Sequence, residues 1–220
     1  MERKLRWMKL DNAAKIYPAA KRRKWNNLFR LSATLTEPVD TETLQAALDR
    51  TVLRFPSIAV RLRRGMFWYY LEEIPKAPNI QPDTAYPVAR MPFDDIRQCA
   101  FRVLYYQNRI AVEFFHALTD GNGGLVFLKT LLAEYLTQKY KISVPAVQGV
   151  LDRDAPPREE EIEDSFLKYE GEISRSRKEA TAFRLDGTPE TDGFLNIITG
   201  ILNTDEVLTE AKKRGVRLTG

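Results

Sequence analysis

The sequence predicts an α/β protein, more specifically an α+β two-layer sandwich in which helices flank a mixed sheet. Apolar runs rich in β-branched and aromatic residues are long enough for strands, and they alternate with segments whose apolar residues repeat every 3.6 positions. Of the 220 residues, 44% are hydrophobic and 29% are charged, the ordinary composition of a folded globular chain. This length allows one large domain or one and a half smaller ones.

The clearest helical pattern precedes Pro56. Mostly apolar residues spaced at i, i+3, i+4, i+7, i+8 and i+11 form one stripe, which comprises Leu44, Ala47, Leu48, Thr51, Val52 and Phe55. Thr41 is a suitable N-cap, because its hydroxyl can accept a hydrogen bond from a free backbone N–H of the first turn. Proline cannot continue a helix, so Pro56 predicts the end. One face of this helix is therefore expected to pack on a core.

Five segments have the composition of strands, and four of them form two hairpins. The segments are 28–36, 58–62, 67–74, 101–106 and 110–115. Arg63, Arg64 and Gly65 form the turn of the first hairpin, and a polar turn at 107–109 joins the strands of the second. The proline-containing segment 75–92 between the hairpins predicts an extended or irregular connection.

By composition, the chain divides into three parts. These are an N-terminal lobe at 1–150, a charged crossover at 151–193 and the start of a second lobe at 194–220. Charge runs such as the one at 158–161 predict an exposed crossover with some helix. Residues 194–203 predict a strand, and 205–214 predict a helix that Gly215 closes just after its C-cap. The last residues, 216–220, complete no further strand or helix, so the second lobe is expected to be truncated.

The cysteine, histidine and hydropathy patterns exclude several classes of protein. A single cysteine, Cys99, excludes an internal disulfide and, with a single histidine, the usual Cys/His zinc clusters. Cys99 is therefore expected to be a small core residue. No apolar run approaches the roughly 18 residues that span a bilayer, and no signal peptide is recognisable. These features predict a cytoplasmic protein without a metal site or a membrane partner.

Charge alone identifies no partner. The 34 basic and 30 acidic residues are interspersed, so the net charge of +4 forms no continuous basic stripe. The basic run 21–24 beside Trp25 could contact a nucleic acid or a phosphate. No RNA-binding or helix-turn-helix pattern accompanies it, however, so a solvated loop is the preferred interpretation and no nucleic-acid partner is expected.

The only histidine begins the motif HALTDG at residues 116–121, directly after the strand 110–115. A neutral imidazole can accept a proton near neutral pH, so His116 is the candidate general base. Asp120 could brace the turn through a buried ion pair, and Gly121 would let backbone or substrate approach closely. The alternative is a half-buried histidine at the end of a strand, without a chemical role.

The sequence after the motif favours a functional role for it. Gly121, Gly123 and Gly124 predict a tight loop, after which an amphipathic helix begins. The helical stripe comprises Leu125, Leu128, Leu131, Leu132, Tyr135 and Leu136. The glycines lack the Lys-Ser/Thr of a P-loop and the GxGxxG spacing after a strand, so they predict no nucleotide site.

Taken together, these segments resemble the superfamily of chloramphenicol acetyltransferases, peptide-synthetase condensation domains and related alcohol and polyketide-associated acyltransferases. The resemblance rests on FHALTDGNGG at 115–124, the helix after it, and FPSIAVRL at 55–62. Condensation domains often begin the motif with two histidines, whereas here the first of these positions holds Phe115. This departure resembles the acetyltransferase branch and leaves the family's base, His116, in place.

The resemblance implies a thioester-dependent O- or N-acyltransferase, in which His116 takes a proton from a hydroxyl or amine acceptor without forming a covalent acyl-enzyme. Asp120 and Gly121 would be structural. No cofactor would be permanently bound, and the co-substrate would be acyl-coenzyme A or an acyl carrier protein. Residues 67–70 could line the acceptor pocket, although at least two of these aromatic side chains would serve the core.

The family's two lobes enclose a tunnel, which implies that this chain is an N-terminal lobe. It would fold by itself but be inactive without a second lobe or self-association. A non-catalytic binding or scaffold domain of the same fold is the alternative function.

Overall fold

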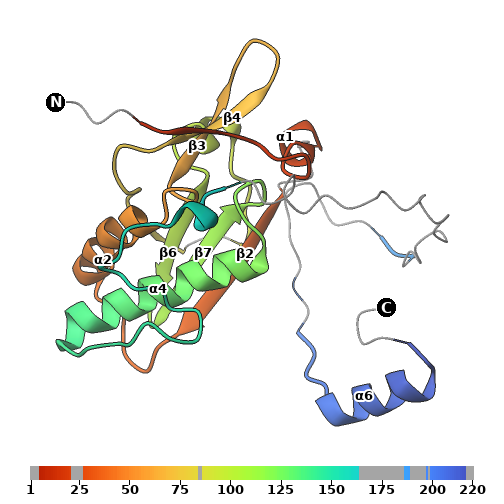
Figure 1. Ribbon diagram of the computed structural model, residues 1–220. Helices are drawn as coiled ribbons and strands as arrows, with labels where there is room; N and C mark the ends of the chain where they lie inside the picture. Colours follow the sequence, from red (N-terminus) through yellow and green to blue (C-terminus); the bar gives the residue numbers. More distant parts are fainter. Residues whose placement is uncertain are drawn as a thin grey trace. The chain divides into compact units, whose positions relative to one another are not determined.

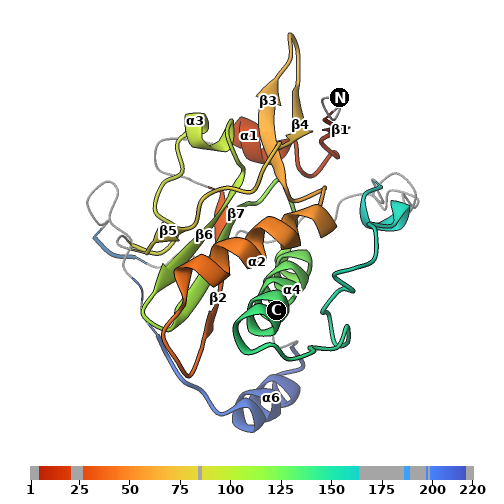
Figure 2. The same ribbon diagram turned by 90° about the vertical axis from the view of Figure 1, so that its left-hand side faces the viewer.

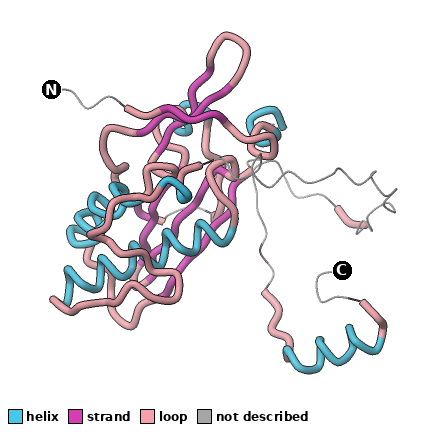
Figure 3. Tube along the Cα trace, viewed as in Figure 1, coloured by secondary structure: helices cyan, strands magenta, loops and turns pink. Residues whose placement is uncertain are grey.

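The protein is described from a computed structural model, which covers residues 5–20, 27–83, 86–163, 186–188, 197 and 199–216 (Figure 1, Figure 3). The chain forms two compact units, Met1–Asp186 and Gly187–Gly220, and each is described by itself. The elements of the first unit are β1 (Trp7–Lys9), α1 (Ile16–Ala20), β2 (Leu28–Thr34), α2 (Thr41–Arg54), β3 (Val60–Arg64), β4 (Tyr69–Glu73), β5 (Gln81–Pro82), α3 (Phe93–Ile96), β6 (Phe101–Tyr106), β7 (Arg109–Phe115), α4 (Gly121–Tyr140) and a 3₁₀ turn at Glu159–Glu161. The second unit contains α6 (Thr204–Lys213).

A four-stranded mixed sheet in the order β2-β7-β6-β5 forms the centre of the first unit. β7 is antiparallel to both β2 and β6, whereas β5 runs parallel to β6. Helices α2 and α4 pack against each other and cover one face of this sheet (Figure 1, Figure 2). The predicted fold class, a mixed sheet with flanking helices, is therefore confirmed.

A second, three-stranded antiparallel sheet has the order β1-β4-β3. Together with the first sheet it contains both predicted hairpins, β3-β4 and β6-β7, which the sequence located to within about two residues. The short strands β1 and β5 were not predicted. β5 has only two residues, one of them a proline, and it pairs on the edge of the sheet, where a strand tolerates proline.

The predicted apolar stripe of α2 faces the main core, where Leu44, Ala47 and Leu48 are completely buried. The prediction of Thr41 as its N-cap is wrong by one residue. Asp40 has the extended conformation of a cap, and its carboxylate accepts a hydrogen bond from the backbone N–H of Thr43 at 2.7 Å. Thr41 is instead the first helical residue.

The glycines after the motif do not form the loop that was predicted. α4 begins at Gly121, directly after its N-cap Asp120, so the glycine-rich segment is the first helical turn. A Cβ atom at Gly124 would lie 3.0 Å from the ring of Phe29 and 3.2 Å from the side chains of Leu31 and Phe114. Glycine at 124 thus lets the helix approach the sheet closely. At Gly121 a Cβ atom would meet nothing within 4 Å.

The contrast between these glycines gives a first prediction. Gly124→Ala is expected to lower the free energy of unfolding by about 1–3 kcal/mol, the usual cost of overpacking a well-filled core. Gly121→Ala is the matched control and should leave stability unchanged or slightly higher, because alanine favours helix over glycine. Urea denaturation of both variants makes the comparison. Equal stability of the two would contradict the close packing of α4 on β2.

The sheet face opposite the helices carries a ladder of charged residues that the sequence analysis did not identify. Arg30 and Arg102 lie on the strands either side of Glu113, directly opposite it in register. The Glu113 carboxylate is completely buried and accepts from Arg30 Nη1 at 3.1 Å, Arg102 Nε at 2.7 Å and the Val88 backbone N–H at 2.6 Å. Three donors thus compensate one buried carboxylate.

Asp83 extends this ladder. Burial opposes its ionisation, but hydrogen bonds and attraction from Arg30 and Arg109 outweigh burial and hold the pKa of Asp83 below its usual range. A carboxyl whose pKa is lowered by folding stabilises the fold above its ordinary pKa. That contribution is lost as the pH falls through the folded value.

In the second unit, the helix was predicted correctly and the strand was not. α6 ends in a Schellman motif: Gly215 has a φ of 66°, its N–H donates to the carbonyl of Lys212, and the N–H of Val216 donates to that of Ala211. This confirms the predicted role of Gly215. Of the predicted strand 194–203, residues 197 and 199–203 are described and form no strand, whereas the other positions lie outside the described residues.

Candidate functional site

His116 immediately follows β7, as its position after an apolar strand predicted. Its backbone N–H donates to the carbonyl of Asn27 at 2.9 Å, and the N–H of Leu118 donates to the carbonyl of Phe115, which turns the chain toward α4. The imidazole is only partly buried, whereas Phe115 before it is fully buried in the smaller core cluster. The end of the strand thus places one histidine at the surface of a cavity and the preceding aromatic ring inside the protein.

Two aromatic rings, called here the aromatic clamp, fix the plane of the imidazole. The ring of Tyr17 stacks on His116 with a centroid distance of 4.8 Å and an interplanar angle of 4°. Phe29 contacts the imidazole at the same centroid distance and an angle of 54°. In the described part of the chain, no residue hydrogen-bonds to the ring nitrogens of His116, so the clamp orients the ring while leaving its nitrogens available to a ligand.

Asn27 connects the clamp to the motif. Its side-chain Nδ2 donates to the carbonyl of Tyr17 at 2.8 Å, while its own carbonyl accepts from the N–H of His116. Asn27 has a φ of 50°, in the left-handed region that asparagine tolerates better than most residues. Neither Tyr17 nor Asn27 was predicted as a site residue. The only local hint in the sequence is that residue 27 is an asparagine, a type that tolerates the left-handed conformation.

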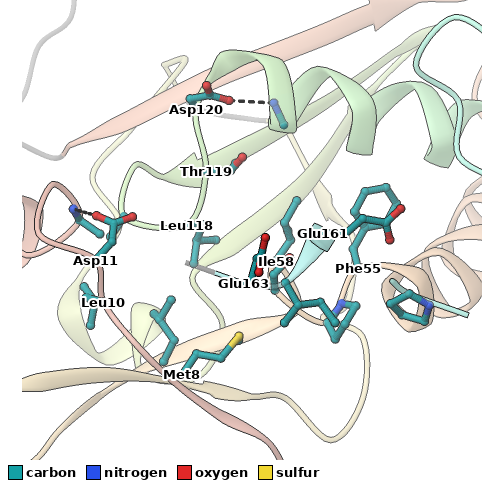
Figure 4. Close-up of a pocket in the computed structure, with 18 of the residues that line it drawn as sticks. Met8, Leu10, Asp11, Phe55, Ile58, Leu118, Thr119, Asp120, Glu161 and Glu163 are labelled. Atoms are coloured by element: carbon teal, nitrogen blue, oxygen red, sulfur yellow. Dashed lines mark hydrogen bonds between the residues drawn. The ribbon is translucent and has the colours of Figure 1, made fainter. Parts of the chain in front are cut away.

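A cavity of about 630 Å³ opens beside His116 (Figure 4). Leu71, Leu151 and four segments line it: residues 8–17 around β1 and α1, residues 54–58 at the end of α2, residues 116–126 around the motif, and residues 157–163. Apolar side chains such as Met8, Leu10, Ile58 and Leu118 supply much of the surface (Figure 4). The two segments that carry the resemblance, 55–62 and 115–124, therefore meet at one cavity.

Residues 152–163 form a strap along this cavity and are held by an arginine on α2. Arg54 is buried, and its Nη1 and Nη2 donate to the Glu161 carboxylate at 2.5 and 2.8 Å, while its Nε donates to the Asp152 carbonyl at 3.0 Å. The hydrogen bonds from Arg54 hold the pKa of Glu161 below its usual range despite partial burial. The start of the predicted charged crossover is therefore anchored beside the site.

Carboxylates outnumber cations around the cavity. The lining includes the acidic residues Asp11, Asp120, Glu160, Glu161 and Glu163, of which all but Glu160 are labelled in Figure 4. Among the described residues, the cationic ones that line it are Lys9 and Arg54, and Arg54 is already paired with Glu161. The described lining therefore carries more acidic than basic residues, which favours ligands with a positive group.

The buried ion pair predicted for Asp120 is wrong. Asp120 is exposed, and its carboxylate accepts from the backbone N–H of Gly123 at 2.9 Å, the bond of a helix N-cap (Figure 4). The substrate-clearance role suggested for Gly121 stays a prediction, although that residue has open space beside it. Asp120 thus braces the motif by starting α4 rather than by neutralising a buried cation.

This role predicts a small effect for Asp120→Ala. Loss of the cap should lower the free energy of unfolding by about 1 kcal/mol, well below the cost of breaking a buried ion pair. Asp120→Asn is the control, because asparagine also caps helices and should retain most of the stability. Thermal or urea unfolding gives the measurement. A loss of several kcal/mol in the alanine variant would contradict the capping role.

The other candidate residues lie away from the cavity or outside the described chain. None of residues 67–70 lines the cavity beside His116, and their suggested place in an acceptor pocket stays a prediction. Cys99 packs against the main core as predicted, and burial raises the pKa of its thiol to about 12. The basic run 21–24 and Trp25 lie outside the described residues.

The described residues contain no candidate membrane span and no candidate metal cluster. No helix there is both long enough and apolar enough to cross a membrane. No group of three or more His, Cys, Asp or Glu side chains in the same part of the chain is arranged to hold a metal ion.

Neither a protein-family model nor a curated protein matches the chain. Among solved structures, the chain is similar to the X-domain from teicoplanin biosynthesis, with 16% identity, a TM-score of 0.49, and coverage of 59% of this chain and 32% of that one. It is also similar to the first condensation domain of the calcium-dependent antibiotic synthetase in complex with a substrate analogue (15% identity, TM-score 0.48, 64% and 40% covered). A third similar structure is the SgcC5 protein from Streptomyces globisporus, with 19% identity, a TM-score of 0.46, and coverage of 56% of this chain and 32% of that one. The chain thus spans between 32% and 40% of the length of these three structures.

Proposed function

We propose that this chain supplies the general-base side of an acyltransferase site, with His116 as the base and an acyl thioester as the donor. The observation that carries the proposal is the position of the only histidine: its ring contacts those of Tyr17 and Phe29, no described residue hydrogen-bonds to its ring nitrogens, and it lies on the wall of a cavity of about 630 Å³. Histidine in such a setting is suited to move a proton during catalysis.

In the proposed reaction, a nitrogen of the neutral imidazole accepts the proton of an acceptor O–H or N–H as that atom attacks the thioester carbonyl. A C–O or C–N bond forms, the C–S bond breaks, and the leaving thiolate takes the proton back from the imidazolium. No atom of the chain becomes acylated and no external oxidant or reductant is needed. The stacking of Tyr17 and Phe29 would hold the imidazole in one plane through both proton transfers.

The charge of the cavity favours an amine acceptor over a neutral hydroxyl. Carboxylates such as Asp11 and Glu160 would attract an ammonium group to the site, and His116 would act once the amine is deprotonated. An acidic lining would also repel phosphates. The anionic part of coenzyme A, or of a carrier protein's prosthetic group, would therefore lie outside this cavity, with only the acyl thioester reaching His116.

A non-catalytic binding or scaffold domain is the second candidate function. The exposed carboxylates along the strap support it, since a cavity that binds a cationic ligand needs no base. The two candidates differ in one respect: an acyltransferase consumes a thioester only when the acceptor is present, whereas a binding domain consumes none.

The experiment is a thioester-cleavage assay on the complete protein that carries this chain. Acyl-coenzyme A and acyl-pantetheine donors of several chain lengths are each offered with primary amines and matched alcohols, and free thiol is measured. Acceptor-dependent thiol release, faster with amines than with the matched alcohols, is the expected result. Absence of acceptor-dependent release across the panel, together with tight binding of the amines, would overturn catalysis in favour of the binding function.

A further inference from the structure

The hairpin β3-β4 ends in an exposed apolar tip. Beyond the last strand pair, Arg64 and Tyr69, the N–H of Gly65 donates to the carbonyl of Trp68 at 2.7 Å and closes the turn. Met66, Phe67 and Trp68 are 85%, 82% and 63% exposed. Both views of the ribbon show this loop projecting from the protein (Figure 1, Figure 2). Three consecutive large apolar side chains are thus presented to solvent at a protrusion.

Cations and aromatic rings lie behind the tip on the outer face of the sheet β1-β4-β3. Register and strand alternation place Trp7, Lys9, Arg61, Arg63, Tyr70 and Glu72 on this face. Trp7 is 62% exposed. One carboxylate on this face, Glu72, pairs with Arg61 and Arg63, and Lys9 is a third cation there. Exposed Arg64 at the tip adds a fourth. The tip and this face together have a clear excess of positive charge.

The order of these groups along the hairpin matches the layers of an anionic membrane surface. Met66 and Phe67 are most distal, the amphipathic indole of Trp68 follows, and the arginines lie farther back along β3. In a bilayer interface, apolar side chains enter the acyl region, tryptophan favours the headgroup level, and cations contact anionic lipids. We propose that the β3-β4 hairpin binds the surface of membranes containing anionic lipids by inserting its tip.

This surface contact differs from the expectation that the protein has no membrane partner, and it needs no membrane-spanning helix. A single-stranded nucleic acid also binds to cations and aromatic rings, but its bases stack on protein rings whose faces lie open on a concave or flat surface. Here the most exposed apolar groups, Met66 and Phe67, are at the end of a projecting turn and one of them has no ring. The lipid surface therefore fits the arrangement better.

The test is co-sedimentation of the protein with vesicles of phosphatidylcholine, with and without phosphatidylglycerol. Binding is expected only to the anionic vesicles, to weaken as salt is added, and to be accompanied by a blue shift of tryptophan fluorescence. Phe67→Ser should weaken vesicle binding about tenfold or more, since a phenyl group transferred out of water contributes at least that factor. Arg64→Gln should weaken it about fivefold, the contribution of one cation near an anionic surface.

Leu53→Ser is the matched control, because Leu53 is an exposed apolar side chain on α2 and should not affect vesicle binding. Equal binding of wild type and Phe67→Ser would overturn the proposal, as would equal binding to neutral and anionic vesicles. Tight binding of a short single-stranded RNA that Phe67→Ser abolishes, with no vesicle binding, would assign the surface to nucleic acid instead. A dimer in sedimentation that only Phe67→Ser dissociates, again without vesicle binding, would assign it to a second copy of the chain.

Discussion

Replacing His116 by alanine is expected to lower the rate of acyl transfer by about two to four orders of magnitude, the usual loss when a positioned general base is removed. No other histidine in the chain can substitute for it. The fold should persist, because the imidazole is only partly buried and its stacking on Tyr17 contributes about 1 kcal/mol. The rate with a fixed thioester and amine is compared for the two proteins, and urea unfolding confirms that the variant is folded.

His116→Phe separates the chemistry of the imidazole from its packing. The phenyl ring can occupy the aromatic clamp between Tyr17 and Phe29, but it accepts no proton. We expect this variant to keep nearly all of the stability and to be as slow as the alanine variant. Near-normal rates in either variant would exclude His116 as the base, whatever the effect on stability.

Removal of the Glu113 carboxylate is expected to have the largest effect on stability. Glu113→Ala would leave the guanidinium groups of Arg30 and Arg102 facing each other across β7 without their shared partner. Breaking a buried ion pair from one side typically costs about 3–5 kcal/mol. Denaturant unfolding at neutral pH should show that the free energy of unfolding falls by this amount.

The exposed ion pair between Asp94 and Arg97 provides the control for Glu113. Both side chains are at least half exposed, so Asp94→Ala should change the free energy of unfolding by less than about 1 kcal/mol. If Glu113→Ala costs no more than this control, the ladder is not the stabilising feature described above. A double variant in which Arg102 is also replaced tests the coupling, since removing both partners should cost less than the sum of the single changes.

Local patterns in the sequence were sufficient to predict the elements that build the main core. Side chains that point the same way recur every 3.6 residues along α2 and every 2 residues along the strands of β6-β7. A pattern with either period therefore predicts which face of the element is buried. The missed N-caps have a simple origin. Asp40 and Asp120 each stand directly before a helix, and aspartate in that position is a signal for the start of a helix. The cap of α2 was instead expected at Thr41, and Asp120 was expected in an ion pair.

The rest of the site depends on contacts between distant segments, which carry no periodic signal. Tyr17 reaches His116 because Asn27, in a left-handed conformation, hydrogen-bonds to the backbone of both. Arg54 lies at the end of α2, and only the fold brings Glu161 to it. In the sequence Arg54 was simply a charged residue near a helix end. The candidate base could therefore be identified from its motif, whereas the residues that orient it and enclose its cavity could not.

The central claim, that the chemistry takes place at His116 in this cavity, is tested most directly by diethylpyrocarbonate, which modifies imidazoles. Because this chain has one histidine, the carbethoxylated fraction of His116 can be measured by mass spectrometry of the peptide that contains it and compared with the loss of acyl transfer in the same sample. We predict that acyl transfer falls in parallel with the modification of His116. Full acyl transfer by protein with a completely modified His116 would contradict the claim.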